Sequence, residues 1–168
     1  IKTGYGLTVD AELKMLRVIK RIKQESLAKI APTLLAAHAI PEAYRAKKDK
    51  YIKLITEQLI PKAAKLNIAY YIDVFCEEGY FDINDTEAIL KAGLKHKLRP
   101  KIHVNQFNIL GGVALGVKHN ALSVDHLEEL NEDDIKALKN SDTIPVALPG
   151  CSYFLSIPYT PARQLIDA

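Results

Sequence analysis

The sequence has little cysteine and no long apolar run. Its 168 residues include only Cys76 and Cys151, too few for a disulfide framework or a cysteine-rich zinc site. Such sparse cysteine fits a reducing compartment, so we expect a cytoplasmic protein. No apolar run approaches the roughly 18 residues of a membrane-spanning helix, and the first residues lack the apolar stretch of a signal peptide. We therefore expect no association with a membrane.

An excess of charge of one sign is also missing. The 23 Lys and Arg residues nearly balance the 20 Asp and Glu residues, which leaves a net charge of +3. This balance argues against a nucleic-acid partner, because proteins that bind nucleic acids usually carry a strongly basic face. Apolar residues make up 48% of the chain, which is enough to bury a core. The chain begins with Ile and its last residues have a helical pattern, so we expect a part of a longer protein.

Strand-like and helix-like patterns alternate along the chain. Six strand-like segments are each followed by a segment with helical periodicity, and neither an internal repeat nor a low-complexity linker divides them. Residues 1–168 are therefore expected to form one domain-level unit. The strand-like segments are 1–4, 32–37, 68–75, 99–102, 121–124 and 143–148.

Several residues predict where the helices begin or break. Thr8 and Asn131 are expected to cap the N-termini of two helices. Asn84 and Glu87 have the spacing of a capping box in front of a third helix. The helical region over 41–66 is expected to break at Pro61, because proline lacks the backbone donor.

Alternating strands and helices imply a parallel sheet with the helices outside it. The two arrangements open at this point are a doubly wound sheet and a (β/α)₈ barrel. Six units are two short of a barrel, which needs roughly 250 residues in all.

Polar residues with metal-binding or acid–base chemistry fall at the C-terminal ends of four predicted strands. These residues are His38, Glu77, His103 and His126. In a barrel such strand ends converge on one mouth, where active sites lie. Neutral imidazole is a common ligand of zinc or iron, and a bound ion lowers the pKa of its water to about 7. The pattern favours metal-assisted hydrolysis over histidines that merely form structural hydrogen bonds.

Two other patterns favour no specific chemistry on their own. Gly4-Tyr5-Gly6 is not a dinucleotide-binding fingerprint, because Val9 stands where a third glycine would be, and it is better explained as a turn between a strand and a helix. Ser123, Asp125 and His126 are too close in sequence to form a catalytic triad. Strand alternation would place Asp125 and His126 on opposite faces.

A series of blocks resembles the imidazolonepropionase family of the metal-dependent amidohydrolase superfamily. The blocks occur in order along the chain and include KTGYGLTVDAELKMLR, TLLAAHAIPEAYR, IDVFCEEGYFD, LRPKIHVNQ, LSVDHLEEL and PYTPARQLIDA. The resemblance implies a distorted (β/α)₈ TIM barrel, of which this chain would supply strands 2 to 7. It also implies hydrolysis of the ring of 4-imidazolone-5-propanoate to N-formimidoyl-L-glutamate in histidine degradation, with one zinc or iron ion.

The resemblance assigns expected roles to five residues. His103 in KIHVNQ matches a metal ligand, and His126 in SVDHLE matches a catalytic histidine that assists proton transfer. His38 and Tyr5 match residues that contact the substrate. Gln106 stands where many members carry Glu. Since Gln cannot accept a proton at neutral pH, Gln106 is expected to bind the substrate by hydrogen bonding.

The resemblance also implies that the family's His-x-His metal pair and its metal-binding Asp lie outside these residues. His103 would then be the one metal ligand that this chain supplies, so we expect the 168 residues alone to be inactive. Two alternatives stay open, namely another amidohydrolase such as an aromatic-base deaminase, and a non-catalytic fragment. The expected partner is a small-molecule substrate, and the sequence leaves a homodimer open.

Overall fold

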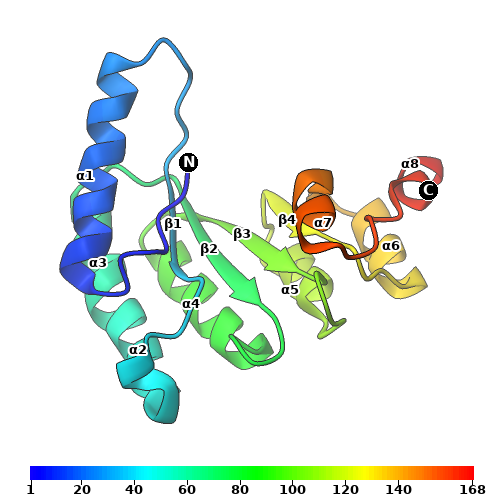
Figure 1. The fold of residues 1–168 in the computed structure, drawn as a ribbon, viewed down its shortest axis with the longest axis horizontal. Helices are drawn as coiled ribbons and strands as arrows, with labels where there is room; N and C mark the ends of the chain where they lie inside the picture. The colour runs from blue at the N-terminus through cyan, green and yellow to red at the C-terminus, as the bar shows by residue number, and fades with distance from the viewer.

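The computed structural model describes residues 1–168 and contains a five-stranded parallel sheet. The strands lie side by side in chain order, and each pairs in parallel with the next (Figure 1). An α/β fold with a parallel sheet is thus confirmed. The five strands form an open sheet with β1 and β5 at its edges. The strands are β1 (Thr33–Ala37), β2 (Tyr71–Cys76), β3 (Arg99–Val104), β4 (Ser123–His126) and β5 (Ile144–Val146).

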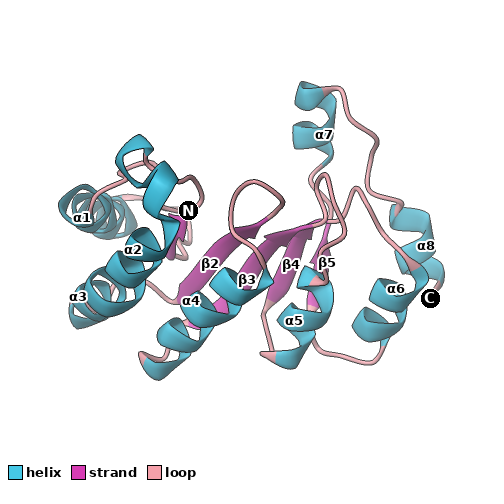
Figure 2. Cartoon of the chain, turned by 90° about the horizontal axis from the view of Figure 1, so that it is seen from below, coloured by secondary structure: helices cyan, strands magenta, loops and turns pink.

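Helices connect successive strands. Figure 2 shows α4 and α5 along one face of the sheet, whereas α7 lies on the other side. No helix is both long and apolar enough to cross a membrane. The helices are α1 (Val9–Glu25), η1 (Glu42–Lys47), α2 (Lys48–Lys53), η2 (Leu54–Leu59), α3 (Ile60–Lys65), α4 (Ile83–Lys95), α5 (Gly112–Lys118), α6 (Glu132–Lys139), α7 (Pro149–Leu155) and α8 (Ala162–Asp167).

The helical face of the sheet forms the hydrophobic core. Ile72 in β2 and Val104 in β3 are fully buried there. The helices approach closely because each presents a glycine at the contact. A Cβ atom on Gly93 of α4 would lie 2.5 Å from Cγ2 of Ile72, and one on Gly112 of α5 would lie 2.5 Å from Cγ1 of Val104.

The opposite face of the same strands carries polar and aromatic side chains. Successive strand residues point to opposite faces, so the neighbours of the core residues lie on this second face. Asp73 and Phe75 in β2 and His103 in β3 are examples, and all three are buried. The alternation of side chains along each strand therefore places the hydrophobic core on one face of the sheet and a candidate functional site on the other.

Residues 1–4, which were expected to form the end of a strand, pair with β1 only in part. Only one bridge forms, between Lys2 and Thr33 of β1. Thr3 N–H donates to Thr33 O at 3.1 Å, but Gly4 follows with a φ of +122° and turns the chain away. The segment therefore lies against the edge of β1 without continuing along it.

The predicted break of the helix at Pro61 is wrong. Helical structure continues from α2 through η2 into α3. η2 is a π-helical turn, in which the N–H of Ile60 bonds to the carbonyl of Ile55, five residues back. Pro61 lies in the first turn of α3. The wider π-helical turn directly precedes Pro61, which has no backbone N–H to donate. The helix therefore continues past this proline without ending.

Three helix starts show how local hydrogen bonding sets the boundaries. The predicted caps at Thr8 and Asn131 are confirmed, since each side chain accepts a backbone N–H of the first turn. The capping box lies two residues earlier than predicted. Asp82 accepts from the N–H of Asp85, and the Asp85 carboxylate accepts from the N–H of Asp82. The two aspartates have the spacing of a capping box but not its usual residue types, which are Ser or Thr followed by Glu or Gln.

The contact between α4 and β2 predicts the effect of Gly93→Ala. Overpacking typically costs 1–3 kcal/mol, whereas alanine gains only about 1 kcal/mol over glycine within a helix. We expect a net loss of up to about 2 kcal/mol in urea unfolding. The matched control is Gly150→Ala in α7, where a Cβ meets nothing within 4 Å. Equal loss in both variants would contradict the packing argument.

Candidate functional site

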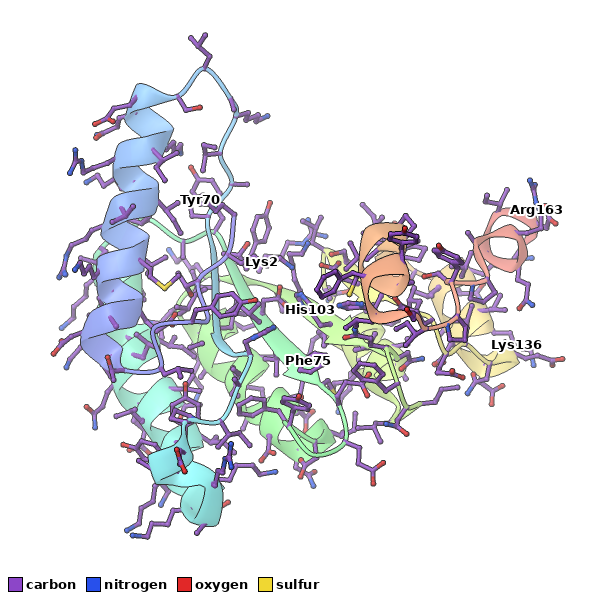
Figure 3. All side chains as sticks on the ribbon, viewed as in Figure 1. Lys2, Tyr70, Phe75, His103, Lys136 and Arg163 are labelled. Carbon is purple, nitrogen blue, oxygen red and sulfur yellow. The ribbon has the colours of Figure 1, made fainter.

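The ammonium group of Lys2 lies among three side chains on the second face of the sheet. Its Nζ is 2.9 Å from Oδ2 of Asp73, 3.0 Å from Oδ2 of Asp125 and 3.2 Å from Nε2 of His103. Figure 3 shows Lys2 and His103 next to each other, whereas Lys136 and Arg163 lie on the outer helices. The three N–H donors of the ammonium thus find three acceptors, one from each of β2, β3 and β4.

These contacts define which nitrogen of His103 carries the proton. An ammonium group can only donate, so Nε2 of His103 must offer its lone pair to Lys2. Nδ1 then carries the hydrogen and donates to Oδ1 of Asp73 at 2.9 Å. A carboxylate that holds Nδ1–H of a histidine is the usual arrangement behind a metal-ligating Nε2.

The charges of the cluster balance. Lys101 adds a second ammonium 3.3 Å from Oδ2 of Asp125, so two cations face two carboxylates. Burial alone would raise the pKa of Asp73, but the imidazole of His103 and the ammonium of Lys2 hold that pKa at about 2. Burial also opposes ionisation of Asp125, yet Lys2 and the hydroxyl of Ser123 keep its pKa below the usual value.

The same cluster is a candidate metal centre. One donor atom from each of Asp73, His103 and Asp125 lies within 4.8 Å of the others, and all three residues are buried. An imidazole with its free nitrogen preset by a carboxylate suits a divalent ion. The donor chemistry thus fits a metal at His103.

The two carboxylates of this cluster were not predicted from the sequence as part of a site. A signal existed for Asp73, because it interrupts the apolar stretch IAYYIDVF, where a buried carboxylate must find a partner. Asp125 was considered only with Ser123 and His126, as a catalytic triad that their close spacing excludes. Ser123 and Asp125 do interact, since the hydroxyl of Ser123 donates to Oδ1 of Asp125 at 2.6 Å.

His126 lies beside His103, with 5.4 Å between the ring centroids. The expectation that Asp125 and His126 point to opposite faces is wrong. His126 has a φ of +93°, which breaks the alternation at the last residue of β4. Burial and the neighbouring His103 lower the pKa of His126, while Glu128 opposes this shift. His126 is therefore neutral at pH 7 and can accept a proton.

His38 and Tyr5, which were predicted to contact the substrate, form an aromatic group next to the cluster around Lys2. The ring of His38 is 5.1 Å from that of Tyr5 and 5.7 Å from that of Phe75. Phe75 in turn lies 6.4 Å from the ring of His103. Tyr5 is 74% exposed, so it could contact a ligand from solvent. Phe75 was not singled out from the sequence, because an aromatic residue in a strand usually belongs to the core.

The turn that carries Tyr5 is held by a buried carboxylate. Glu12 of α1 accepts the N–H of Gly6 at 2.7 Å and that of Gly4 at 3.1 Å. A Cβ atom on Gly4 would lie 2.6 Å from the carbonyl oxygen of Leu35. Both glycines of the Gly4-Tyr5-Gly6 pattern are thus required by close backbone approach.

Gln106 lies on the loop after β3, which a second buried carboxylate holds. Oε1 of Glu77 accepts the N–H of Gln106 at 2.7 Å and that of Phe107 at 3.3 Å. Burial raises the pKa of Glu77, and these backbone donors oppose the shift. The side chain of Gln106 lies 3.5 Å from Sγ of Cys151, and no hydrogen bond joins it to His103 or His126. The structure thus brings His103 and His126 together and places Gln106 to one side.

Known proteins resemble this chain along its entire length. It is 58% identical over 168 residues to imidazolonepropionases of Christiangramia forsetii and Flavobacterium johnsoniae, and 46% identical over 166 residues to that of Aliivibrio fischeri. The chain spans about 41% of the length of these relatives. No family model matches the chain.

One solved structure has the same fold. Guanine deaminase from C. acetobutylicum, with guanine bound in its active site, superposes with a TM-score of 0.51 at 17% identity. The match covers 96% of this chain and 49% of that protein. At this identity the likeness concerns the fold alone.

The low pKa of Asp73 predicts a loss of stability in acid. Because this pKa is lower in the folded state, the stabilisation is complete above about pH 4 and disappears as the pH falls through about 2. A shift of this size corresponds to roughly 2 kcal/mol. We expect Asp73→Asn to be destabilised at pH 7 and to lose less stability than the parent protein between pH 4 and 2, measured by urea unfolding.

The control for this prediction is Asp133→Asn, because the Asp133 side chain is 93% exposed. Its pH dependence should match that of the parent protein. An Asp73→Asn variant that weakens in acid as steeply as the parent would contradict the assigned charge interaction.

Proposed function

We propose that this chain is the central part of an imidazolonepropionase, a hydrolase that opens the ring of 4-imidazolone-5-propanoate to N-formimidoyl-L-glutamate in histidine degradation. The observation that carries the proposal is 58% identity to imidazolonepropionases along all 168 residues. The placement of His103 beside His126 at neighbouring strand ends supports it. Sparse cysteine and balanced charge support a cytoplasmic enzyme whose partner is a small molecule, rather than a nucleic acid or a membrane.

We also propose that residues 1–168 belong to an amidohydrolase-type (β/α)₈ barrel domain. The parallel strands in chain order, with helices between them, are the repeating unit of such a barrel. The Lys2 segment beside β1 and the edge at β5 would pair with strands from the remainder of the longer protein. Polar side chains at the strand ends would then face the barrel mouth.

We propose that His103 binds one divalent ion, zinc or iron, through Nε2. Such an ion lowers the pKa of water and polarises a carbonyl oxygen, as ring hydrolysis requires. Asp73 holds Nδ1–H of His103 and so keeps the imidazole plane and tautomer fixed. Asp125 and Asp73 supply the negative charge that a cation at this point needs.

The remaining site residues have roles that follow from their chemistry. The neutral imidazole of His126 accepts a proton from the attacking water and returns it to the departing ring nitrogen. His38, Tyr5 and Phe75 present ring faces and edges that suit a flat five-membered ring. Gln106 offers an amide donor and acceptor to the polar edge of the substrate.

The first test removes the proposed metal ligand. In the full-length enzyme, His103→Ala should lower the metal content from about one ion per chain to a small fraction of that, because the site loses its nitrogen donor. The variant should also fail to open the substrate ring. Metal is measured by elemental analysis and activity by loss of imidazolonepropanoate absorbance. The control is His96→Ala, since His96 is exposed and follows α4. Full metal content in His103→Ala would contradict the assignment.

The second test separates the two histidines. His126→Ala should retain its metal and lower kcat by about 10²–10⁴-fold, as expected for loss of a general acid–base group. An unchanged kcat would remove His126 from the mechanism. Parallel assays with guanine test the alternative of an aromatic-base deaminase. Release of ammonia from guanine, without ring opening of imidazolonepropanoate, would overturn the proposed function.

A further inference from the structure

His126 has an unusual backbone conformation that surrounding contacts maintain. His126 and Leu127 both have positive φ values, +93° and +65°. Such conformations in non-glycine residues cost of order 1–3 kcal/mol each and persist only where the surrounding structure holds them. The hydroxyl of Thr160 donates to the carbonyl of His126 at 2.6 Å, and the N–H of Leu127 donates to Val104 O at 3.2 Å. The imidazole is thereby brought beside His103.

A third buried carboxylate faces this imidazole. Oε2 of Glu128 lies 3.5 Å from Nδ1 of His126, and both residues are buried. Neither of these two atoms has any other hydrogen-bond partner in the protein. The second oxygen of Glu128 accepts the hydroxyl of Ser152 at 2.8 Å. No lysine or arginine forms an ion pair with Glu128, so the two groups beside its oxygens are this hydroxyl and the imidazole.

We propose that Glu128 is a positioning residue for His126, an inference that rests on the proposed function. A carboxylate can only accept, so it selects the tautomer of His126 with the hydrogen on Nδ1. Nε2 then keeps its lone pair and is the nitrogen that takes the proton from water. A small side-chain movement closes the 3.5 Å separation, since catalytic hydrogen bonds often tighten only when substrate is bound.

Ser152 makes this arrangement specific. It is fully buried in α7, an otherwise exposed helix in which Tyr153 is 77% and Phe154 84% exposed. Its hydroxyl holds one carboxylate oxygen of Glu128 and so directs the other towards His126. The chain Ser152–Glu128–His126 therefore links α7 to the end of β4 through side chains alone.

The test uses the full-length enzyme with Glu128→Gln, which keeps the shape of the side chain and removes its charge. We expect kcat to fall by about 10–100-fold, the usual effect of losing a partner of a functional histidine, with KM within about twofold and metal content unchanged. Ser152→Ala should lower kcat by less, because the carboxylate stays. The matched control is Glu129→Gln, one residue along and exposed, which should leave kcat unchanged.

A measurement without substrate decides the tautomer directly. Nitrogen-15 NMR of histidine-labelled enzyme distinguishes Nδ1–H from Nε2–H, and the His126 signals are assigned by their loss in His126→Gln. We expect Nδ1–H in the parent enzyme and a shift towards Nε2–H in Glu128→Gln. An Nε2–H tautomer in the parent, or an unchanged kcat in Glu128→Gln, would overturn the proposal. If the parent enzyme fails to open imidazolonepropanoate, the proposed function fails, and the NMR result still decides the role of Glu128.

Discussion

The ammonium group of Lys2 connects the N-terminal segment to three strands at one point. It is bonded to Asp73 of β2, His103 of β3 and Asp125 of β4. Buried charges are costly unless they are paired and hydrogen-bonded, so each carboxylate depends on the position of this cation. The tautomer of His103, the pairing of Asp73 and the neutrality of the cluster all follow from it. His103 is thus positioned by an electrostatic balance rather than by apolar packing.

Buried carboxylates recur around the site, each serving a different loop. Glu12 holds the turn of Tyr5, Glu77 holds the loop of Gln106, and Glu128 faces His126. The first two accept backbone N–H groups, which otherwise would lack partners in a tight turn. These acceptors keep the turn of Tyr5 and the loop of Gln106 in place. Loops are mobile by default, and these contacts make two of them part of the scaffold.

The sequence predicted the strand ends well, because hydrophobic periodicity and the order of the elements depend on neighbouring residues. His103 and His126 are found together for that reason. The features that the sequence could not predict depend on contacts between residues far apart in the chain. The bonds of Lys2 to Asp73 and Asp125 leave no local pattern, and the positive φ of His126 is imposed by distant contacts such as that of Thr160. The family resemblance supplied residue roles that spacing alone left open.

The order of the sheet has a consequence for how the chain acquires its structure during synthesis. Each strand pairs with the one made just before it and then with the one made next, so a growing chain can add one strand and helix at a time. Lys2 is made before all three of its partners, and Asp125 follows it by 123 positions. The last acceptor of the ammonium therefore arrives only when β4 has emerged. The polar face is completed late, on a core whose earlier layers are already assembled.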